Sequence, residues 1–557
     1  MSSTNEAQRP DAGHRLPSRR AVVAASAWSV PAIAVATASP AYAASAEGPV
    51  NIPPTLTGVI GGGWSIATAF GANGLPTGYA RSARPTATRI PITVSPARAT
   101  VVTVTVSGAG FALYTVANNT AFLPTQSVTV TTSATGVAEV FVAIPPFSKG
   151  DTTATITAAA NGDSAVSTLT AEPGLAYTLG GHTPEGQTGN GALLNAVGYP
   201  TPWALDVPLA AVYATQSSFM GITADGRVRT GGWNTSGECG VGAVSTAVAV
   251  PAEPIKEDGT VFTDAVRGIG AQNGSEQSLF ILEDSSGDWW AAGQQLGNSL
   301  AMTGNIADRS LTRFTKIGQA LPAKPTWVSY TRNSNVNLFT LADGTAWLAG
   351  TRVNMQYYDR GISTTGPSMV QLTWPDGTPV TGVKKAVQSN DRGMMLLFED
   401  GRLAYSGTAT TNITPADYPG DGRLHEIATP PGGIAELWER QPYEWETAGY
   451  FIKNTRDELY MLGGAYYGQS GHGMTTPVRE WTKIPVENVD DFACGAHAML
   501  VLDHSGDVWY SGVNDENNSG IDPAFAGPYA TATKVTTLPP NAKAIAVTWW
   551  DAPFVAY

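Results

Sequence analysis

The sequence predicts an all-β protein in which a seven-bladed β-propeller follows an N-terminal β-sandwich. Two observations carry this prediction: an apolar hairpin pattern recurs along 174–557, and Thr and Val alternate with period 2 in the segment before it. The composition agrees, because only 14% of the 557 residues are charged and 61 are glycine. Long exposed helices need more charge, whereas many short strands need many turns.

The recurring unit is an apolar strand, a Gly-bearing turn and a second apolar strand that ends at glycine. In the clearest copy, 219–232, the turn carries Asp225-Gly226, and Asp-Gly recurs at Asp343 and Asp400. This pair favours two-residue hairpins, because both central residues there adopt positive φ. The six copies end at Gly232, Gly293, Gly350, Gly407, Gly463 and Gly512. Such a spacing, about 50–60 residues, is typical of propeller blades.

The two ends of this region supply a seventh copy. Residues 175–181 look like the second strand of a unit that lacks its first, and 554–557 look like the first strand of a unit that then stops. Joined, they form one blade closed by both ends of the propeller, which removes exposed sheet edges. We therefore expect a seven-bladed propeller over 174–557.

A shared tail follows the terminal glycine in three copies. It reads Gly-Gln-Thr-Gly-Asn-Gly at 186–191, Gly-Glu-Cys-Gly-Val-Gly at 237–242 and Gly-Gln-Ser-Gly-His-Gly at 468–473. These residues resemble the repeats of the regulator of chromosome condensation family, whose consensus runs through an apolar strand, Asp-Gly and a Gly-Gln-x-Gly-x-Gly tail. The resemblance covers 174–557, although the third, fourth and sixth copies lack most of the tail.

The resemblance implies a propeller fold and leaves several functions open. The founding member of the family works on a small GTPase and chromatin. A secreted bacterial member, β-lactamase inhibitor protein II, is similar to this region in blade count and export, and it clamps its target with loops on one face. We carry over that mode of binding and not the target.

Residues 44–173 predict a β-sandwich with an N-terminal linker. Strand candidates such as 101–106 and 153–158 alternate Thr with Val, Ala or Ile between Gly and Asn turns. The pattern Thr132-x-x-x-Gly136-Val137-Ala138-x-Val140 resembles bacterial Ig-like domains of surface proteins. Such domains act as spacers, so we expect this Ig-like domain to carry the propeller without chemistry of its own.

The first 43 residues predict a twin-arginine export signal peptide. Arg19 and Arg20 precede a mildly apolar stretch rich in Ala and Val, and Ala41-Tyr42-Ala43 offers a cleavage site after Ala43. No later apolar run approaches the length of a membrane span. We therefore expect an exported bacterial protein, extracellular or associated with the cell surface, monomeric and without a transmembrane segment in the mature chain.

The charge distribution argues against nucleic acid as a partner. The whole chain carries a formal net charge of −13, of which 1–43 contribute +2 and 44–173 are balanced, so 174–557 carry −15. A phosphate backbone is held mainly by Lys and Arg, and a surface of this balance repels it.

The expected binding surface lies in the loops that precede the apolar hairpins, because these seven loops differ from copy to copy while the strands repeat. The longest loop, 438–446, holds Trp, Tyr and Arg, which are enriched at interface hot spots. The candidate binding residues are Asn273, Glu276, Arg332, Asn335, Asp391, Arg392, Trp438, Arg440, Tyr443, Trp445, His497, Trp549, Trp550 and Asp551.

The sequence predicts no enzyme, no cofactor and no metal site. After export five His remain, and none stands at a zinc spacing or beside a nucleophile motif. Cys239 and Cys494 fall in copies that are not neighbours, so two buried thiols are expected rather than a disulfide.

The expected function is therefore binding of an unknown extracellular protein through one loop face of the propeller. One alternative is a propeller that binds cell-wall glycan or cleaves polysaccharide, because 13 of the 15 Trp lie in 174–557 and sugar rings stack on exposed aromatic rings. A second alternative, inhibition of a β-lactamase or related enzyme, is implied by the resemblance alone.

Overall fold

The computed structural model describes residues 49–557 with several gaps. The gaps are 65–81, 84–85, 116–124, 181–186, 188, 190–198, 274–276, 304–307, 331–334, 352–357, 359–367, 390–392, 408–413, 441–448, 516–517, 523–524, 526 and 549–551. The predicted export signal, with Arg19, Arg20 and Ala43, lies outside the described residues.

The first region consists of two sheets that share one core. One sheet has the order β1 (Val50–Asn51), β5 (Thr88–Val94), β9 (Val137–Ala143) and β7 (Ala112–Tyr114). The other has the order β2 (Thr55–Val59), β11 (Asp163–Glu172), β10 (Thr153–Ala160), β6 (Val101–Ser107) and β8 (Ser127–Thr131). A further pair is β3 (Gly63–Trp64) and β4 (Ser82–Ala83).

Strand β6 shows why these residues form a two-layer structure. Val102, Val104 and Val106 are buried, and the residues between them are exposed. The buried side chains belong to one core with Ile90 of β5 and Val140 of β9 in the other sheet. Alternation with period 2 therefore places one face of each sheet on a shared apolar layer.

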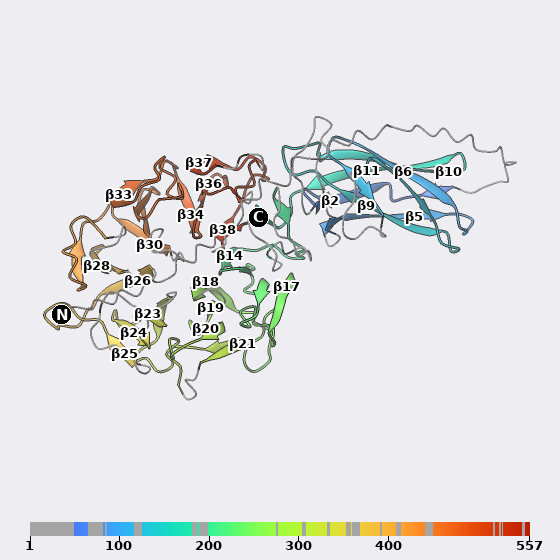
Figure 1. Cartoon of the computed structure of the whole chain (residues 1–557). Helices are drawn as coiled ribbons and strands as arrows, with labels where there is room; N and C mark the ends of the chain where they lie inside the picture. The colour runs from blue at the N-terminus through green and yellow to red at the C-terminus, as the bar shows by residue number, and fades with distance from the viewer. Residues whose placement is uncertain are drawn as a thin grey trace, which may run out of the picture. The chain divides into compact units, whose positions relative to one another are not determined.

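Seven four-stranded antiparallel sheets follow within the described part of the chain (Figure 1). Their strands are β14 (Ala211–Ala214), β15 (Ser218–Ile222), β16 (Val228–Asn234) and β17 (Ser245–Ala252); β18 (Ala265–Asn273), β19 (Gln277–Asp284), β20 (Trp289–Gln295) and β21 (Arg309–Lys316); β22 (Pro325–Ser329), β23 (Val336–Leu341), β24 (Ala346–Gly350) and β25 (Ser368–Gln371); β26 (Val383–Ser389), β27 (Gly393–Phe398), β28 (Leu403–Gly407) and β29 (His425–Ile427); β30 (Ile434–Arg440), β31 (Gly449–Asn454), β32 (Leu459–Gly463) and β33 (Val478–Lys483); β34 (Val489–Cys494), β35 (Ala498–Asp503), β36 (Val508–Gly512) and β37 (Tyr529–Lys534); and β13 (Thr201–Pro202), β12 (Ala176–Thr178), β39 (Pro553–Ala556) and β38 (Ala544–Val547).

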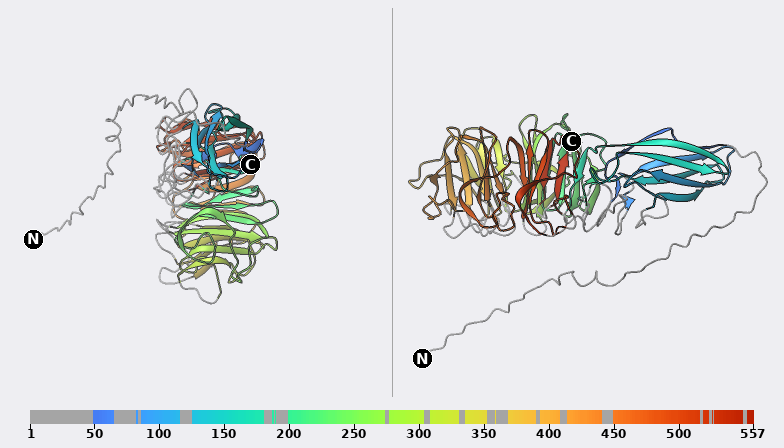
Figure 2. Two further views of the ribbon diagram at one scale, coloured as in Figure 1. Left: turned by 90° about the vertical axis from the view of Figure 1, so that its right-hand side faces the viewer. Right: turned by 90° about the horizontal axis from the view of Figure 1, so that it is seen from above.

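These sheets form a ring, and Figures 1 and 2 show it face-on and from two further sides. We call β14, β18, β22, β26, β30, β34 and β38 the inner strands, since each is the edge strand of its sheet that lies toward the centre of the ring. Neighbouring inner strands contact one another at β14–β18, β22–β26, β26–β30 and β34–β38, and β38 returns to β14. The predicted all-β class and the predicted β-propeller are therefore confirmed.

One sheet joins segments that are far apart in sequence. Strand β12 pairs antiparallel with β39, in the register Ala176↔Ala556 and Thr178↔Phe554. The Phe554 ring packs against Trp203, with ring centroids 5.2 Å apart, and Trp203 lies 3.9 Å from the ring of Phe219 in the next sheet. Aromatic packing thus continues across the junction between this sheet and the sheet of β14–β17.

The terminal glycine of the repeat has a clear steric cause. At Gly293 the backbone has φ of 121°, and an added Cβ would overlap the carbonyl oxygen of Ser278. At Gly512 the same overlap would occur with the carbonyl oxygen of His497, at φ of 124°. The second hairpin strand therefore ends where only glycine lets the partner carbonyl approach.

The Asp-Gly turns form, but not as the two-residue hairpins that the sequence analysis predicted. Gly226, Gly344 and Gly401 have positive φ, whereas the aspartate before each of them does not. The Gly226 N–H donates to the Thr223 carbonyl, and the Thr223 N–H donates to the Arg227 carbonyl, at 2.9 and 2.8 Å. This is a longer turn with a glycine bulge, in which only the glycine must be left-handed.

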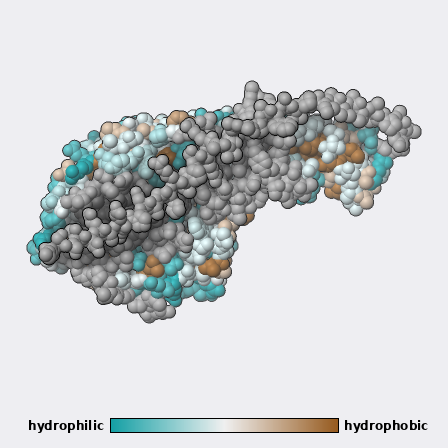
Figure 3. All heavy atoms as spheres, viewed as in Figure 1, coloured by the Kyte–Doolittle hydropathy of each residue, from teal (hydrophilic) through white to brown (hydrophobic). Residues whose placement is uncertain are grey.

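Figure 3 shows that the described propeller surface on this side is mostly hydrophilic, with only small separate apolar areas. Among the described residues, no helix has the length and apolar character that crossing a bilayer requires.

Candidate functional site

The predicted loop face is the end of the ring at which the inner strands finish. Each inner strand pairs antiparallel with the strand that follows it, so the seven connections between them lie at this same end. Many of the predicted residues lie in connections outside the described residues: Glu276, Arg332, Asp391, Arg392, Tyr443, Trp445, Trp549, Trp550 and Asp551. Asn273 and Arg440 end strands β18 and β30, and only their backbone is described.

Asn335 and His497 occupy the same position of the repeat, directly before the second strand of a sheet. The Asn335 carbonyl accepts from the Thr351 N–H at 3.2 Å, and the His497 carbonyl accepts from the Val513 N–H at 3.0 Å. The backbone therefore closes the hairpin here whatever the side chain is. The His497 ring lies 4.3 Å from the ring of Tyr467, which belongs to the fifth copy.

Trp438 differs from its predicted position in the loop 438–446. It lies within β30, two residues before the strand ends, and it faces the central channel of the ring. Its ring packs against Phe492 of β34, with centroids 5.9 Å apart. The sequence analysis placed the loop boundary too early, because an aromatic residue before a polar run fits a strand end equally well.

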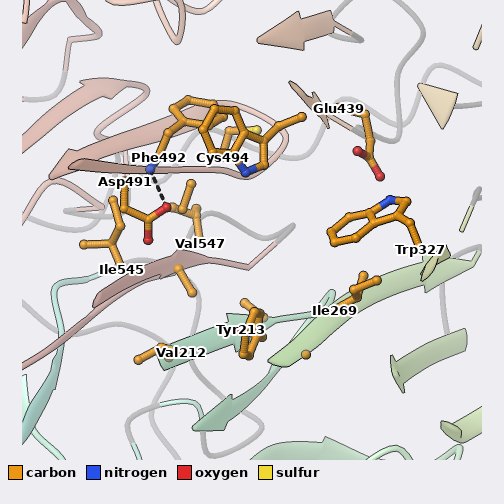
Figure 4. Close-up of a pocket in the computed structure, with 16 residues that line it drawn as sticks. Val212, Tyr213, Ile269, Trp327, Glu439, Asp491, Phe492, Cys494, Ile545 and Val547 are labelled. Carbon is orange, nitrogen blue, oxygen red and sulfur yellow. Dashed lines mark hydrogen bonds between the residues drawn. The ribbon is translucent and has the colours of Figure 1, made fainter. Parts of the chain in front are cut away.

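The central channel encloses about 230 Å³ between the inner strands (Figure 4). Apolar walls come from Val212, Ile269, Phe492 and Ile545, and Figure 4 shows Trp327 and Glu439 on the opposite side of the space from Asp491. The side chains that line the channel therefore come from six of the seven inner strands.

A β-bulge recurs near the start of five inner strands. It lies between Ala265 and Arg267, Pro325 and Trp327, Val383 and Lys385, Ile434 and Glu436, and Val489 and Asp491. A bulge adds one residue and redirects the side chain that follows. Trp327 and Asp491 line the channel, whereas Arg267, Lys385 and Glu436 hold the equivalent position of their own strands but are not among the residues that line it. We call these five residues the channel ring.

The cationic half of the channel ring is organised around the Trp327 indole. Lys385 places its ammonium 3.8 Å from the ring centroid, and the Arg267 guanidinium lies 5.4 Å from it. Arg267 also pairs with Glu283 at 2.5 Å and donates to the carbonyl of the bulge residue Thr326. The electron-rich indole face attracts both cations.

The Lys385 ammonium is the least satisfied charge of this half. Within the described residues it has no hydrogen bond or ion pair, and its contacts are with the indoles of Trp327 and Trp438. Desolvation lowers its pKa to about 8, although Glu439 and Glu436 oppose this shift. The Ser329 hydroxyl donates to the Glu439 carboxylate at 3.0 Å.

The acidic half consists of Glu436 and Asp491 on the next two inner strands. Lys453 lies 3.5 Å from the Glu436 carboxylate and donates to the carbonyl of the bulge residue Asp490 at 2.8 Å. Asp491 accepts from the N–H of Phe492 at 2.8 Å, and burial raises its pKa to about 6.

The sequence analysis did not identify the channel ring. The five residues precede their hairpins by different numbers of residues, since the connection after each inner strand varies in length. A search for polar residues in short strands upstream of each hairpin could have found them, but no fixed spacing marks them.

The channel also holds one of the two thiols. Cys494 lines it, whereas Cys239 is fully buried, and neither forms a disulfide. Among the described residues, no group of three or more His, Cys, Asp or Glu side chains is arranged to hold a metal ion. The arrangement as described can bind a charged ligand by ion pairing and aromatic contact.

Comparison with known proteins places the fold. No family model and no curated protein matches the sequence. Human WBSCR16 is similar in structure, with a TM-score of 0.52 and 14% identity over 68% of this chain and 97% of the other. Yeast RCC1 (Prp20) bound to Kap60 has a TM-score of 0.52 and 15% identity, over 68% of this chain and 88% of the other. Prp20p from Saccharomyces cerevisiae, in a structure described with its binding to Gsp1p and histones, has a TM-score of 0.52 and 15% identity, over 68% of this chain and 90% of the other. The propeller of this chain is therefore of the RCC1 type in its fold.

Proposed function

We propose that this chain is an exported binding protein without catalytic activity. In this proposal 1–43 are a twin-arginine signal peptide, 44–173 are an Ig-like spacer, and 174–557 are a seven-bladed propeller closed by both its ends. The propeller binds another extracellular protein through its loop face.

The observation that supports this function is the contrast between constant strands and variable connections at one end of the ring. The second and third strands pair in the same way in sheet after sheet, and an added Cβ at the terminal glycines Gly232, Gly293, Gly350 and Gly512 would overlap a backbone carbonyl. The connections after the inner strands run from the short 215–217 to the long 441–448. A rigid scaffold with divergent loops is typical of a binding surface. RCC1-type neighbours have been studied in protein complexes, which agrees with this choice.

Affinity capture tests the proposal. The mature chain, from residue 44 onward, is immobilised and exposed to culture medium and cell-wall extract. We expect one protein at a defined stoichiometry, retained after glycosidase treatment and lost in the variant Tyr443→Ala/Trp445→Ala. Met369→Ala, an exposed residue on the outer strand β25, is the control and should retain the partner.

Two outcomes would contradict protein binding through the loop face. Retention of glycan that is lost in Trp445→Ala would favour the carbohydrate alternative. Equal capture of the protein by the double variant would place the contact elsewhere. Inhibition of a β-lactamase at nanomolar concentration would identify the second alternative as the partner class, and no effect at micromolar protein would remove it.

A further inference from the structure

We propose that the outward face of the five-stranded sheet in the N-terminal region is a self-association surface, on which a second copy of this chain stacks face to face. We call this surface the threonine face: it consists of the outward residues of β2, β11, β10, β6 and β8, which alternate with the buried ones (Figure 1). It belongs to the N-terminal region and not to the propeller, so it does not depend on the proposed protein partner. In place of the monomer that the sequence predicts, the chain would form a weak dimer.

Hydroxyl side chains stand in register across the strands of the threonine face. One row crosses β2, β11, β10 and β6 and consists of Thr55, Thr168, Thr155 and Ser107. The next row crosses β11, β10, β6 and β8 and consists of Val166, Thr157, Thr105 and Ser127. All of these side chains are exposed except Thr157, which is half-buried. The alternate residues of the same strands fill the core, so the rows face outward.

These rows of the threonine face carry no charged residue. Glu172, the outward residue after Thr170 on β11, stands at one margin, opposite Val59 of β2. The outward face of the other sheet differs, because Arg89 of β5 and Glu139 of β9 form an ion pair on it. Charged side chains normally keep exposed surfaces soluble and apart. A broad exposed face without charge is therefore suited to contact with another uncharged face.

A second copy of the threonine face has matching chemistry. A threonine hydroxyl is both a donor and an acceptor, so two such faces can exchange hydrogen bonds without opposing like groups. The threonine methyl groups and Val166, which is 56% exposed, would also leave water on contact. High β-propensity without charge or proline favours dry stacking of sheets, and β10 has this composition throughout.

Other classes of partner gain less from the threonine face. Its two rows contain no aromatic side chain, so a glycan finds no ring on which to stack. They contain no Lys or Arg for an anionic polymer and no carboxylate for a basic peptide, so neither forms an ion pair there. A second copy, which brings the same uncharged face, has no unpaired charge to desolvate.

The area of the threonine face fits a weak dimer. Strands lie about 4.8 Å apart and outward residues of one strand about 6.7 Å apart, which gives a face of about 500 Å². Two faces in contact would bury about 1,000 Å² in total, at the lower limit of specific interfaces. The same patch on both copies closes the contact after two chains, so we expect a dimer with a Kd of about 0.1 mM.

Sedimentation equilibrium of the mature chain, from residue 44 onward, tests the proposal. The chain is examined from about 5 μM to about 1 mM, a range that spans the expected Kd. We expect the weight-average mass to rise from that of a monomer towards that of a dimer, with no larger species.

A charge-swap experiment locates the contact. Thr155 and Thr168 are exposed and directly paired, so Thr155→Lys/Thr168→Lys places two ammonium groups on the face and Thr155→Glu/Thr168→Glu places two carboxylates there. Each variant alone should self-associate at least about tenfold more weakly, because like charges meet across the contact. An equal mixture of the two should recover association, because opposite charges then meet.

Asn51→Lys/Thr93→Lys is the matched control, since these two residues are exposed and directly paired on the other sheet. This variant should associate as the unmodified chain does, and the melting temperature of each variant reports whether it is folded. The proposal is wrong if the chain stays monomeric up to about 1 mM, if the lysine variant of the threonine face associates as strongly as the control, or if the mixture recovers nothing. A monomeric chain that captures cell-wall glycan, and loses it in Thr155→Lys/Thr168→Lys, would also overturn the proposal and make a glycan the occupant.

Discussion

The hairpins of this propeller are alike from sheet to sheet, whereas the inner strands differ in the side chains that they carry. The hairpins of β15–β16 and its counterparts repeat the same register and end at glycine, because a partner carbonyl occupies the space of a Cβ. The inner strands repeat a backbone feature, the bulge, but carry Arg, Trp, Lys, Glu and Asp after it. Uniform hairpins thus build the ring, and the side chains that differ between sheets lie on the inner strands and in the connections.

The largest effect on stability is expected from a substitution that disrupts a hairpin. Gly293→Ala forces a Cβ into the Ser278 carbonyl at φ of 121°, so we expect a loss of about 3 kcal/mol or more in the free energy of unfolding. Gly377→Ala is the control, since at φ of 90° its Cβ meets no atom within 4 Å, and it should cost about 1 kcal/mol. Urea unfolding of both variants measures the difference. Equal losses of stability in the two variants would mean that the contact with the Ser278 carbonyl does not explain why glycine stands at position 293.

The next-largest effect is expected from replacing Glu238, which differs from the Gln at the same position of the other two tails. Glu238 is buried where the other two tails carry Gln187 and Gln469, and burial raises its pKa to about 8. The folded state therefore keeps a proton that the unfolded state loses above about pH 4.5, so stability falls as pH rises from 4.5 to 8. Glu238→Gln should raise the free energy of unfolding by roughly 2–4 kcal/mol at pH 8.

The same substitution should have almost no effect below pH 4, where the carboxyl is protonated in both states. Unfolding curves of both proteins across this pH range provide the test. A gain that does not depend on pH would show that packing, rather than the carboxyl charge, explains the difference.

A smaller effect is expected at Lys385, which contacts the channel-lining Trp327. The pKa of Lys385 falls to about 8, so the folded state disfavours the charged ammonium and stability rises as pH increases from 8 to 10.5. Lys385→Met removes this cost, and we expect a gain of about 1–2 kcal/mol at pH 7 that vanishes above pH 10.5. Lys384→Met, at an exposed position, should change stability by less than about 0.5 kcal/mol. A loss of stability in Lys385→Met would mean that its cation–π contacts outweigh desolvation.

The hairpins could be predicted from the sequence because their determinants are local. A glycine at each strand end and an Asp-Gly turn act over a few residues, and aligned copies reveal them. The detail of the turn was wrong, since one left-handed residue suffices where two were expected. The alternation of β6 likewise reflects burial on one face of a sheet.

The channel ring could not be predicted in the same way. Lys385 and Trp327 lie on different sheets and meet only when the two neighbouring sheets pack against each other. Connections of different length separate each inner strand from its hairpin, so no fixed spacing survives in the sequence. Trp438 shows the same limit: its side chain faces the channel because of strand register, which composition alone does not determine.

Hydroxyl-radical footprinting of the mature chain with its captured partner tests the central claim most directly. We predict protection of side chains in the connections of the loop face, above all in 441–448 and 549–551, with no change at Met369 on β25 or Val101 on β6. Protection confined to outer strands or to the N-terminal sheets would contradict the claim that the variable connections form the binding surface.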